Sequence, residues 1–269
     1  MSCPDLVLLV PSRGRPANVQ RLNETCKRTC TARTLLHFGF DDDDPKLEEN
    51  VAAASTHAIT LHERMNLTGW TNYLAGKYTG DDPLYEPPAA LASIGDDMVP
   101  ETPGWDTALL DALPAGGGAA YAHSNRRDDI PEHIVISTPL VAALGRFALF
   151  GGHWYIDEGW RDVFGPSGAG CLAFVPDVTI RHLHPNVPGG DPADRTYHDA
   201  AEEFDANLAA YQRWRLSPRG MAADIDTVRR ARAGSPASPG TARHDPAALG
   251  DRPGPVPART DGPAAAAHR

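Results

Sequence analysis

The feature that most constrains the fold of this chain is a short apolar segment that ends in two adjacent carboxylates. Ala90–Ile94 carries small and branched residues without charge, and Gly95, Asp96 and Asp97 follow it directly. Such a segment is typical of a strand that is covered on both faces of a sheet. Ligands bind where strands end in an open α/β sheet, so carboxylates there favour a divalent cation and its phosphate. The alternative is a solvated turn in which an aspartate caps the next helix.

The composition agrees with one large α/β domain. The chain has 269 residues, of which 41% are hydrophobic, enough for a sizeable core. The net charge of −10 argues against nucleic-acid binding, because surfaces that contact phosphates are basic. No apolar segment approaches the roughly 20 residues of a membrane span, and Leu6–Val10 is too short for a signal peptide, so we expect a soluble, cytoplasmic protein. Cys26 and Cys30 lack a second ligand pair for zinc.

The first expected strand and helix are joined by a loop that suits an anion. Asp5–Val10 predicts the strand, and Pro11–Pro16 opens the helix. Proline suits a first helical turn and Gly14 permits a tight bend, so the backbone amides can face a ligand. Arg13 and Arg15 add guanidinium groups that pair bidentately with phosphate oxygens, which makes this loop a candidate diphosphate clamp. The alternative is that both arginines are ordinary exposed loop residues.

A run of four aspartates follows the second expected strand. Thr34–Phe40 predicts that strand, and Asp41–Asp44 come directly after it. Adjacent carboxylates normally form a solvated tip, but this strand end also suits an acceptor for ribose hydroxyls or base N–H groups. Farther along, Asn66–Lys77 predicts a helix that is mostly core. Arg64 and Asn72 could reach a ligand from its N-terminal half.

Two later segments carry further candidate groups. Asp157 and Asp162 lie among aromatic and apolar residues, and such surroundings can raise the pKa of a carboxylate until it accepts a proton near neutrality. Helix capping and surface ion pairing are the alternatives for both. Val178–His184 predicts a strand in which alternation places His182 and His184 on one side, as a pair of metal ligands would lie. The alternative is that hydrogen bonds alone satisfy them.

The rest of the pattern completes a single domain with a C-terminal extension. Gly170–Val175 and Val178–His184 predict two strands around a Pro-Asp turn. Pro185–Arg195 is expected to be a loop that covers the site, and Thr196–Arg215 one amphipathic helix. Large apolar residues are almost absent beyond the last helix. Burial of apolar surface therefore could not offset the conformational entropy that this segment would lose on ordering. We expect three parts, namely a domain over residues 1–216, a helical extension over 217–233 and a disordered tail over 234–269.

In this order the motifs resemble those of GT-A glycosyltransferases, most closely the family-2-like enzymes encoded by bacteriophages of actinobacteria. The resemblance runs from Asp5 to Trp214 and rests on five segments, Pro11–Pro16, Asp41–Pro45, Gly95–Met98, Tyr155–Asp162 and Val178–Pro185. It implies one GT-A, Rossmann-like α/β domain with a mostly parallel central sheet flanked by helices. It also implies transfer of a sugar from a nucleotide-diphosphate donor to an acceptor hydroxyl, with inversion and with Mn²⁺ or Mg²⁺. A phage enzyme would act in the host cytoplasm.

The resemblance also implies roles for individual residues. Asp97 would bind the cation together with His182 or His184. Asp157 would be the general base, with Asp162 as its substitute. Met98 follows the acidic pair, so a full Asp-x-Asp motif is missing and either carboxylate could touch the cation. The candidate donor-binding residues are Pro11, Ser12, Arg13, Arg15, Asp41, Asp43, Arg64, Asn72 and Asp96.

Two other functions stay open from the sequence. A nucleotidyltransferase uses a similar sheet and acidic metal ligands, but often a loop richer in glycine and a lysine. A non-catalytic carbohydrate- or nucleotide-binding domain could have the same fold. The acceptor could be a glycan, a protein or a modified nucleobase, and the sequence names neither the donor sugar nor its nucleotide. Retention of the anomeric configuration is the open alternative to inversion.

Overall fold

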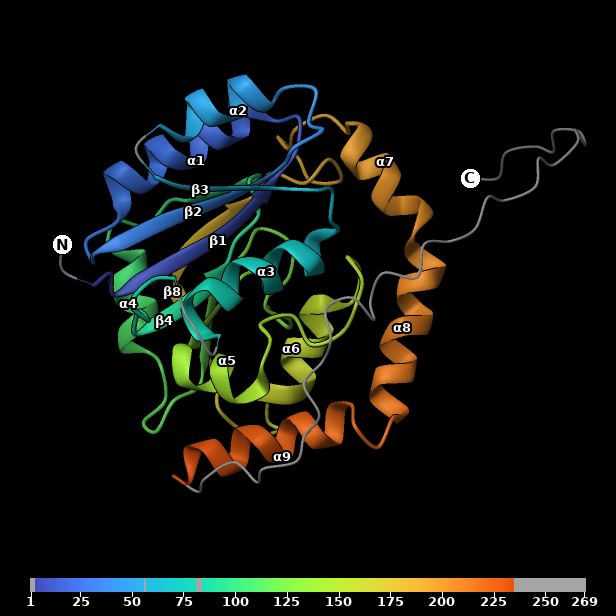
Figure 1. The fold of residues 1–269 in the computed structure, drawn as a ribbon. Helices are drawn as coiled ribbons and strands as arrows, with labels where there is room; N and C mark the ends of the chain where they lie inside the picture. Colours follow the sequence, from blue (N-terminus) through green and yellow to red (C-terminus); the bar gives the residue numbers. More distant parts are fainter. Residues whose placement is uncertain (1–2, 56, 81–83, 235–269) are drawn as a thin grey trace, which may run out of the picture. The chain divides into compact units, whose positions relative to one another are not determined.

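A computed structural model describes residues 3–55, 57–80 and 84–234 (Figure 1). The tail expected over residues 234–269 lies outside the described residues except for Gly234. No helix of the described ranges is long and apolar enough to cross a membrane.

The described residues form one eight-stranded sheet in the order β3-β2-β1-β4-β7-β6-β8-β5. Neighbours β3, β2, β1 and β4 run parallel, as do β6 and β8, whereas β7 and β5 run antiparallel to their neighbours. The expected α/β fold with a mostly parallel sheet is therefore confirmed. The strands are β1 (Leu6–Ser12), β2 (Thr34–Asp41), β3 (Ala58–His62), β4 (Ala90–Ser93), β5 (Met98–Pro100), β6 (Ala119–His123), β7 (Ile134–Ser137) and β8 (Leu172–His182).

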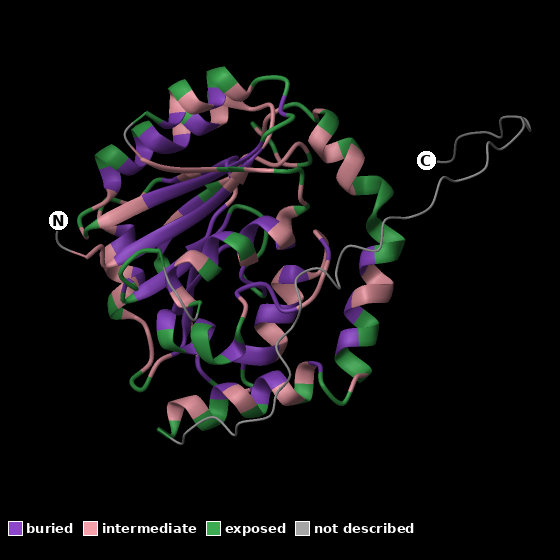
Figure 2. Ribbon diagram, in the orientation of Figure 1, coloured by how far each residue is buried: buried purple, intermediate pink, exposed green. Residues whose placement is uncertain are grey.

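Helices cover both faces of this sheet, and β1 shows why. Its side chains alternate, so Val7 and Leu9 enter one apolar core while Leu6, Leu8 and Val10 enter the other. Helices α3, α5, α6, α8 and α9 contribute to the first core, and α1, α2 and α4 to the second. Figure 2 shows the buried strands between helices with exposed outer faces. The helices are α1 (Pro16–Thr29), α2 (Leu47–Ala54), α3 (Leu67–Thr79), α4 (Trp105–Asp111), α5 (Thr138–Leu144), α6 (Ile156–Phe164), α7 (Arg195–Glu202), α8 (Phe204–Leu216) and α9 (Met221–Arg232).

The structure corrects two expected elements. The two strands expected around a Pro-Asp turn are one strand, β8, because the register against β6 shifts from Val175 to Thr179 and absorbs Pro176 and Asp177 as an irregularity. The helix expected over Thr196–Arg215 is two helices, α7 and α8, which meet at Glu203.

The short strand β5 was not expected, and it fixes the position of the acidic pair. Met98 is paired with His182, and Pro100 with Ile180, in an antiparallel ladder. The chain therefore leaves β4, passes through Asp96 and Asp97, and pairs at once with the end of β8. Residues far apart in sequence meet at this edge of the sheet.

Candidate active site

The first carboxylate of the acidic pair binds the loop after β1. Asp96 is buried, and its Oδ2 accepts a hydrogen bond from Ser12 Oγ at 2.5 Å. Its Oδ1 accepts one from Arg15 Nη1 at 3.1 Å. Burial raises the pKa of Asp96, while Arg15 favours the charged form and the neighbouring Asp97 adds to the rise. Asp96 thus orients the arginine that the sequence predicts as an anion ligand.

The second carboxylate faces β8 and α7. Asp97 Oδ2 lies 3.4 Å from His182 Nε2 and accepts a hydrogen bond from the Tyr197 hydroxyl. Arg15 Nη1 is 4.0 Å from the same oxygen. Burial alone would raise the pKa of Asp97, but His182 and Tyr197 hold it below its ordinary value. Asp97 is therefore an ionised carboxylate in a buried setting.

His182 lies between two carboxylates, one of which the sequence analysis missed. Its Nδ1 is 3.7 Å from Glu132 Oε2, on the side of the ring away from Asp97. Burial opposes the charge of His182, but the two carboxylates raise its pKa to about 9. Glu132 is itself buried, accepts a hydrogen bond from Ser124 Oγ at 2.7 Å and pairs with Arg126 at 2.8 Å. The only sequence signal for Glu132 was an acid just before an apolar strand.

His184 contacts the ring of His182 rather than the acidic pair itself. Its ring centroid is 5.4 Å from that of His182 and 5.2 Å from that of Tyr197. Burial lowers the pKa of His184 to about 4, so its ring is neutral at physiological pH. Within the part of the chain that the structure describes, no group of three or more His, Cys, Asp or Glu side chains is arranged to hold a metal ion. Of the three metal ligands predicted from the sequence, Asp97 and His182 are the two whose side chains are in contact.

The aspartate run lies at the end of β2 and meets the loop after β1, as expected for neighbouring parallel strands. Arg13 Nη1 is 2.9 Å from Asp41 Oδ2 and also pairs with Asp43. Asp41 is buried, and its Oδ1 accepts hydrogen bonds from Trp70 Nε1 at 2.7 Å and from the Met65 amide at 3.2 Å. Asp43 is 57% exposed, so it is the carboxylate of this pair that faces solvent.

Other polar side chains near this edge support the fold. The Asp44 carboxylate accepts hydrogen bonds from the Gly14 amide at 2.8 Å and from Asn50 Nδ2 at 2.7 Å, and so fixes the loop after β1. Asn72 Oδ1 accepts from the amides of Phe147 and Ala148 at 2.8 and 2.7 Å. Asn72 thus ties α3 to the segment after α5. Pro11 and Ser12 are the last residues of β1, and Arg64 pairs with Asp199 of α7 at 3.2 Å.

The structure separates the two aspartates of α6. Asp157, in the first turn, is half-buried and has no hydrogen-bond or ion-pair partner among the described residues. Burial and two neighbouring glutamates raise its pKa to about 8. Asp162 instead faces α8, where it accepts a hydrogen bond from the Tyr211 hydroxyl at 2.7 Å and lies 3.3 Å from Arg215 Nε.

The segment before α6 adds one candidate that the sequence analysis missed. Burial lowers the pKa of His153, and its ring interacts electrostatically with Asp97, Arg15 and His182. Tyr155, two residues before Asp157, has a φ of +69°, a conformation that bulky residues rarely adopt. Such backbone outliers persist where the surrounding structure holds them, and they cluster at functional sites.

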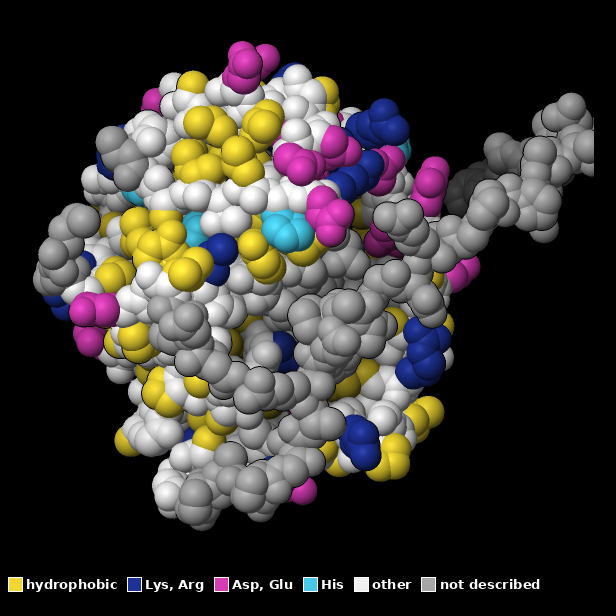
Figure 3. All heavy atoms as spheres, viewed as in Figure 1, with side chains coloured by type: hydrophobic (Ala, Val, Ile, Leu, Met, Phe, Trp, Pro, Cys, Tyr) yellow, Lys and Arg dark blue, Asp and Glu magenta, His cyan; other side chains and the backbone are white. Residues whose placement is uncertain are grey.

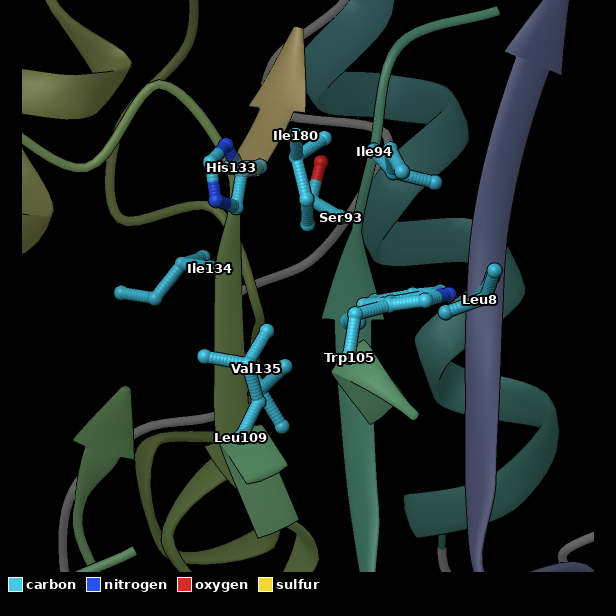
Figure 4. A pocket seen from close by; sticks show the side chains of 10 residues that line it. Leu8, Ser93, Ile94, Trp105, Leu109, His133, Ile134, Val135 and Ile180 are labelled. Carbon is cyan, nitrogen blue, oxygen red and sulfur yellow. The ribbon is translucent and has the colours of Figure 1, made fainter. Parts of the chain in front are cut away.

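A small cavity lies elsewhere, between β1, β4, β7 and α4 (Figure 4). Its volume of ≈ 10 Å³ is about that of one water molecule. Its lining is mostly apolar and includes Leu8, Trp105 and Val135. This cavity is a packing feature of the core, and the polar edge of the sheet is the candidate site.

Comparisons with known proteins bear on the fold. No family model matches the sequence, and no curated protein sequence matches it significantly. A mannosyltransferase from Pyrobaculum calidifontis, solved with GDP-mannose and Mn²⁺, matches with a TM-score of 0.58 and 15% identity over 86% of this chain and 70% of that one. A glucosyl-3-phosphoglycerate synthase from Mycobacterium tuberculosis, solved with Mg²⁺ and uridine diphosphate, matches with a TM-score of 0.50 and 11% identity over 87% of this chain and 80% of that one. At these identities the likeness shows a shared fold, the expected GT-A fold.

The raised pKa of Asp157 predicts how stability depends on pH. The folded protein keeps the proton of Asp157 up to about pH 8, whereas the unfolded chain loses it near the ordinary value of 3.8. Unfolding therefore releases a proton between these pH values, and Asp157 destabilises the fold increasingly as pH rises through this window. We expect Asp157→Asn to raise the free energy of unfolding by about 2 kcal/mol at pH 8, a value discounted for partial solvation.

Urea unfolding of the wild type and the variant at pH 5 and pH 8 measures this effect. Asp162→Asn is the matched control on the same helix. It loses ion pairs with Arg161 and Arg215, so its stability should fall at both pH values. A variant Asp157→Asn that is less stable than the wild type at pH 8 would contradict the assignment.

Proposed function

We propose that this protein is a metal-dependent glycosyltransferase that moves a sugar from a nucleotide-diphosphate donor to an acceptor hydroxyl, with inversion. The observation that carries the proposal is the convergence of Arg15, Asp97 and His182 at one edge of a GT-A sheet. The mannosyltransferase and the synthase of similar fold were solved with GDP-mannose and with uridine diphosphate, each together with a divalent cation. These ligands support a nucleotide-sugar donor for this chain.

The side chains at this edge fit a divalent cation that also binds the donor. Asp97 would supply one carboxylate, and His182 would supply one imidazole after losing the proton that it carries in the free protein. The nearest atoms of the two side chains are 3.4 Å apart. Mg²⁺ is commonly held by one or two carboxylates together with substrate phosphates and water, so a site with few protein ligands is sufficient. When bound, the cation would supply a Lewis acid that stabilises negative charge on the departing diphosphate.

The remaining residues divide between the donor and the acceptor. Arg15 would bind the diphosphate, and Asp43 with Arg13 would face the ribose or base. Asp157 would accept the proton of the acceptor hydroxyl as its oxygen attacks the anomeric carbon and the nucleoside diphosphate leaves. Asp157 is better suited to this role than Asp162, because its carboxylate has no competing partner among the described residues and the pKa of about 8 makes it a base near neutrality.

Three finer expectations stay predictions. They are membership of the family-2-like branch, origin in a phage of actinobacteria, and a cytoplasmic location.

Loss of Asp97 should abolish turnover. The wild type, incubated with Mn²⁺ and a panel of GDP-, UDP- and TDP-sugars, should release nucleoside diphosphate from one of them. Asp97→Asn should lower that rate at least about 100-fold, because a Lewis-acidic cation contributes several kcal/mol to the transition state. Asp162→Asn, measured in parallel, should keep most of the rate. Unchanged turnover in Asp97→Asn would remove Asp97 from the site, and pyrophosphate formed from a nucleoside triphosphate and a sugar phosphate would indicate a nucleotidyltransferase.

Turnover should depend on the protonation of Asp157. A general base acts only when deprotonated, so kcat/KM for transfer should rise with pH and level off above about 8, the pKa of Asp157. Asp157→Asn should lower the rate by about 10²- to 10⁴-fold and remove this rise, while donor affinity stays the same. The pH profile of donor turnover, with the donor Kd measured separately, checks both statements. A variant that keeps the wild-type profile would exclude Asp157 as the base.

Glu132 should strengthen cation binding although it lies behind His182. A carboxylate behind a metal-binding imidazole fixes its tautomer and orientation, and loss of such a partner typically costs about 10- to 100-fold in metal affinity. We expect Glu132→Gln to weaken Mn²⁺ binding by this factor, measured by electron paramagnetic resonance of free Mn²⁺. Glu158→Gln, a nearby acid that pairs with Arg127, is the control and should bind Mn²⁺ as the wild type does. Equal affinities for all three proteins would show that Glu132 has no such role.

A further inference from the structure

A short segment lies across the residues that we assign to the donor. We call residues 191–199 the strap; it comprises the end of the loop after β8 and the first residues of α7. Figure 1 shows α7 near the end of the sheet toward which β1 and β2 point. Asp191 pairs with Arg21 of α1 at 2.5 Å, and Asp199 with Arg64 at 3.2 Å. These two pairs anchor the strap beside the site.

Between the anchors, the strap contacts the proposed ligands themselves. Asp194 accepts two hydrogen bonds from Arg15, from Nε at 2.6 Å and from Nη2 at 2.8 Å. This bidentate geometry is the one by which a guanidinium binds phosphate oxygens. The Tyr197 ring lies 4.6 Å from the guanidinium carbon of Arg15, and its hydroxyl donates to Asp97. The Asp194 carboxylate therefore binds Arg15, the residue assigned to the diphosphate. The Tyr197 hydroxyl binds Asp97, the residue assigned to the cation.

Ion pairs and hydrogen bonds, rather than a buried apolar face, make most of the strap's contacts. Helix α7 has no buried residue, whereas α8, which follows it, buries Tyr211 and Trp214. The carboxylate side chain of Asp194 is 41% exposed, and that of Asp199 is 42% exposed. Acidic and basic side chains lie interspersed over this part of the surface (Figure 3). Exposed ion pairs contribute little stability each and are screened by salt, so a charged ligand can displace a segment that they hold.

We propose that the strap is autoinhibitory. Asp194 occupies on Arg15 the place of the donor diphosphate, and the Tyr197 hydroxyl occupies on Asp97 the place of the cation. Donor and cation bind by displacing the strap. The proposal rests on the proposed function, because that function assigns Arg15 and Asp97 to these ligands.

The closed strap lowers the apparent affinity for the donor. A ligand that binds only the open form has its Kd raised by the reciprocal of the open fraction, so a strap closed in nine molecules of ten costs about tenfold. Removing the competing carboxylate should recover that factor. The same substitution can leave the helix intact, because Asp194 caps α7 by accepting from the Tyr197 amide, and asparagine caps a helix as well as aspartate does.

The experiment uses the full chain with Asp194→Asn. Titration calorimetry with UDP and with GDP, each with Mn²⁺ at low salt, should give a Kd about tenfold lower than that of the wild type. Glu202→Gln is the matched control, since it removes one negative charge from α7 at a residue without an ion-pair partner among the described residues. Its Kd should equal that of the wild type, and thermal unfolding checks that both variants are folded.

A second variant tests the cation side and does not depend on the first. Tyr197→Phe keeps the ring beside Arg15 and removes the hydroxyl from Asp97, so Mn²⁺ alone should bind several-fold more tightly. Weaker Mn²⁺ binding by Tyr197→Phe, or equal nucleotide affinities of the wild type and Asp194→Asn, would overturn the strap proposal while the wild type still binds nucleotide. If neither the wild type nor Asp194→Asn binds a nucleoside diphosphate, the proposed function fails together with it.

Discussion

The site depends on the contact between Asp97 and His182. Asp97 follows β4 and His182 ends β8, and the antiparallel pairing of Met98 with His182 brings them together. A buried carboxylate without a partner would lower the stability of the fold. Asp97 can therefore lie in this buried position only beside positive charge. His182 and Arg15 supply that charge, and the same two side chains lead to the neighbouring groups of the site.

From this contact, charge balance extends across the whole edge of the sheet. Asp96 is bound by Ser12 and Arg15, and Glu132 by Ser124 and Arg126. Each of these two buried acids is therefore matched by a base and a hydroxyl donor. Asp157 is different, because it has no such partner among the described residues, and burial together with Glu158 and Glu132 raises its pKa. Strongly perturbed pKa values cluster at functional sites, which agrees with the proposed role of Asp157 in proton transfer.

The charged side chains of this site also need partners in the protein without ligand. Arg15 is held by Asp96 on one side and by Asp194 on the other, and Asp97 is held by His182 and Tyr197. The strap supplies two of these partners, Asp194 and Tyr197. Its charged contacts are partly exposed, so under the proposed function they are exchanged for those of a diphosphate and a cation at small cost. The same side chains then contribute to the stability of the free protein and to its affinity for the ligand.

By itself, the sequence determined which residues leave a strand at the ligand-binding edge. The apolar run before Asp96, the proline and glycine of the loop after β1 and the aspartates after β2 are local patterns, and parallel strands place their ends together. Tertiary structure alone decided the partners. Ser12 meets Asp96 across 84 residues and Tyr197 meets Asp97 across 100, and no local spacing encodes such pairs. The fold also turned Asp162 toward α8, engaged Asn72 with backbone amides and placed Glu132 behind His182, because these positions depend on which elements pack against one another rather than on the residues beside them.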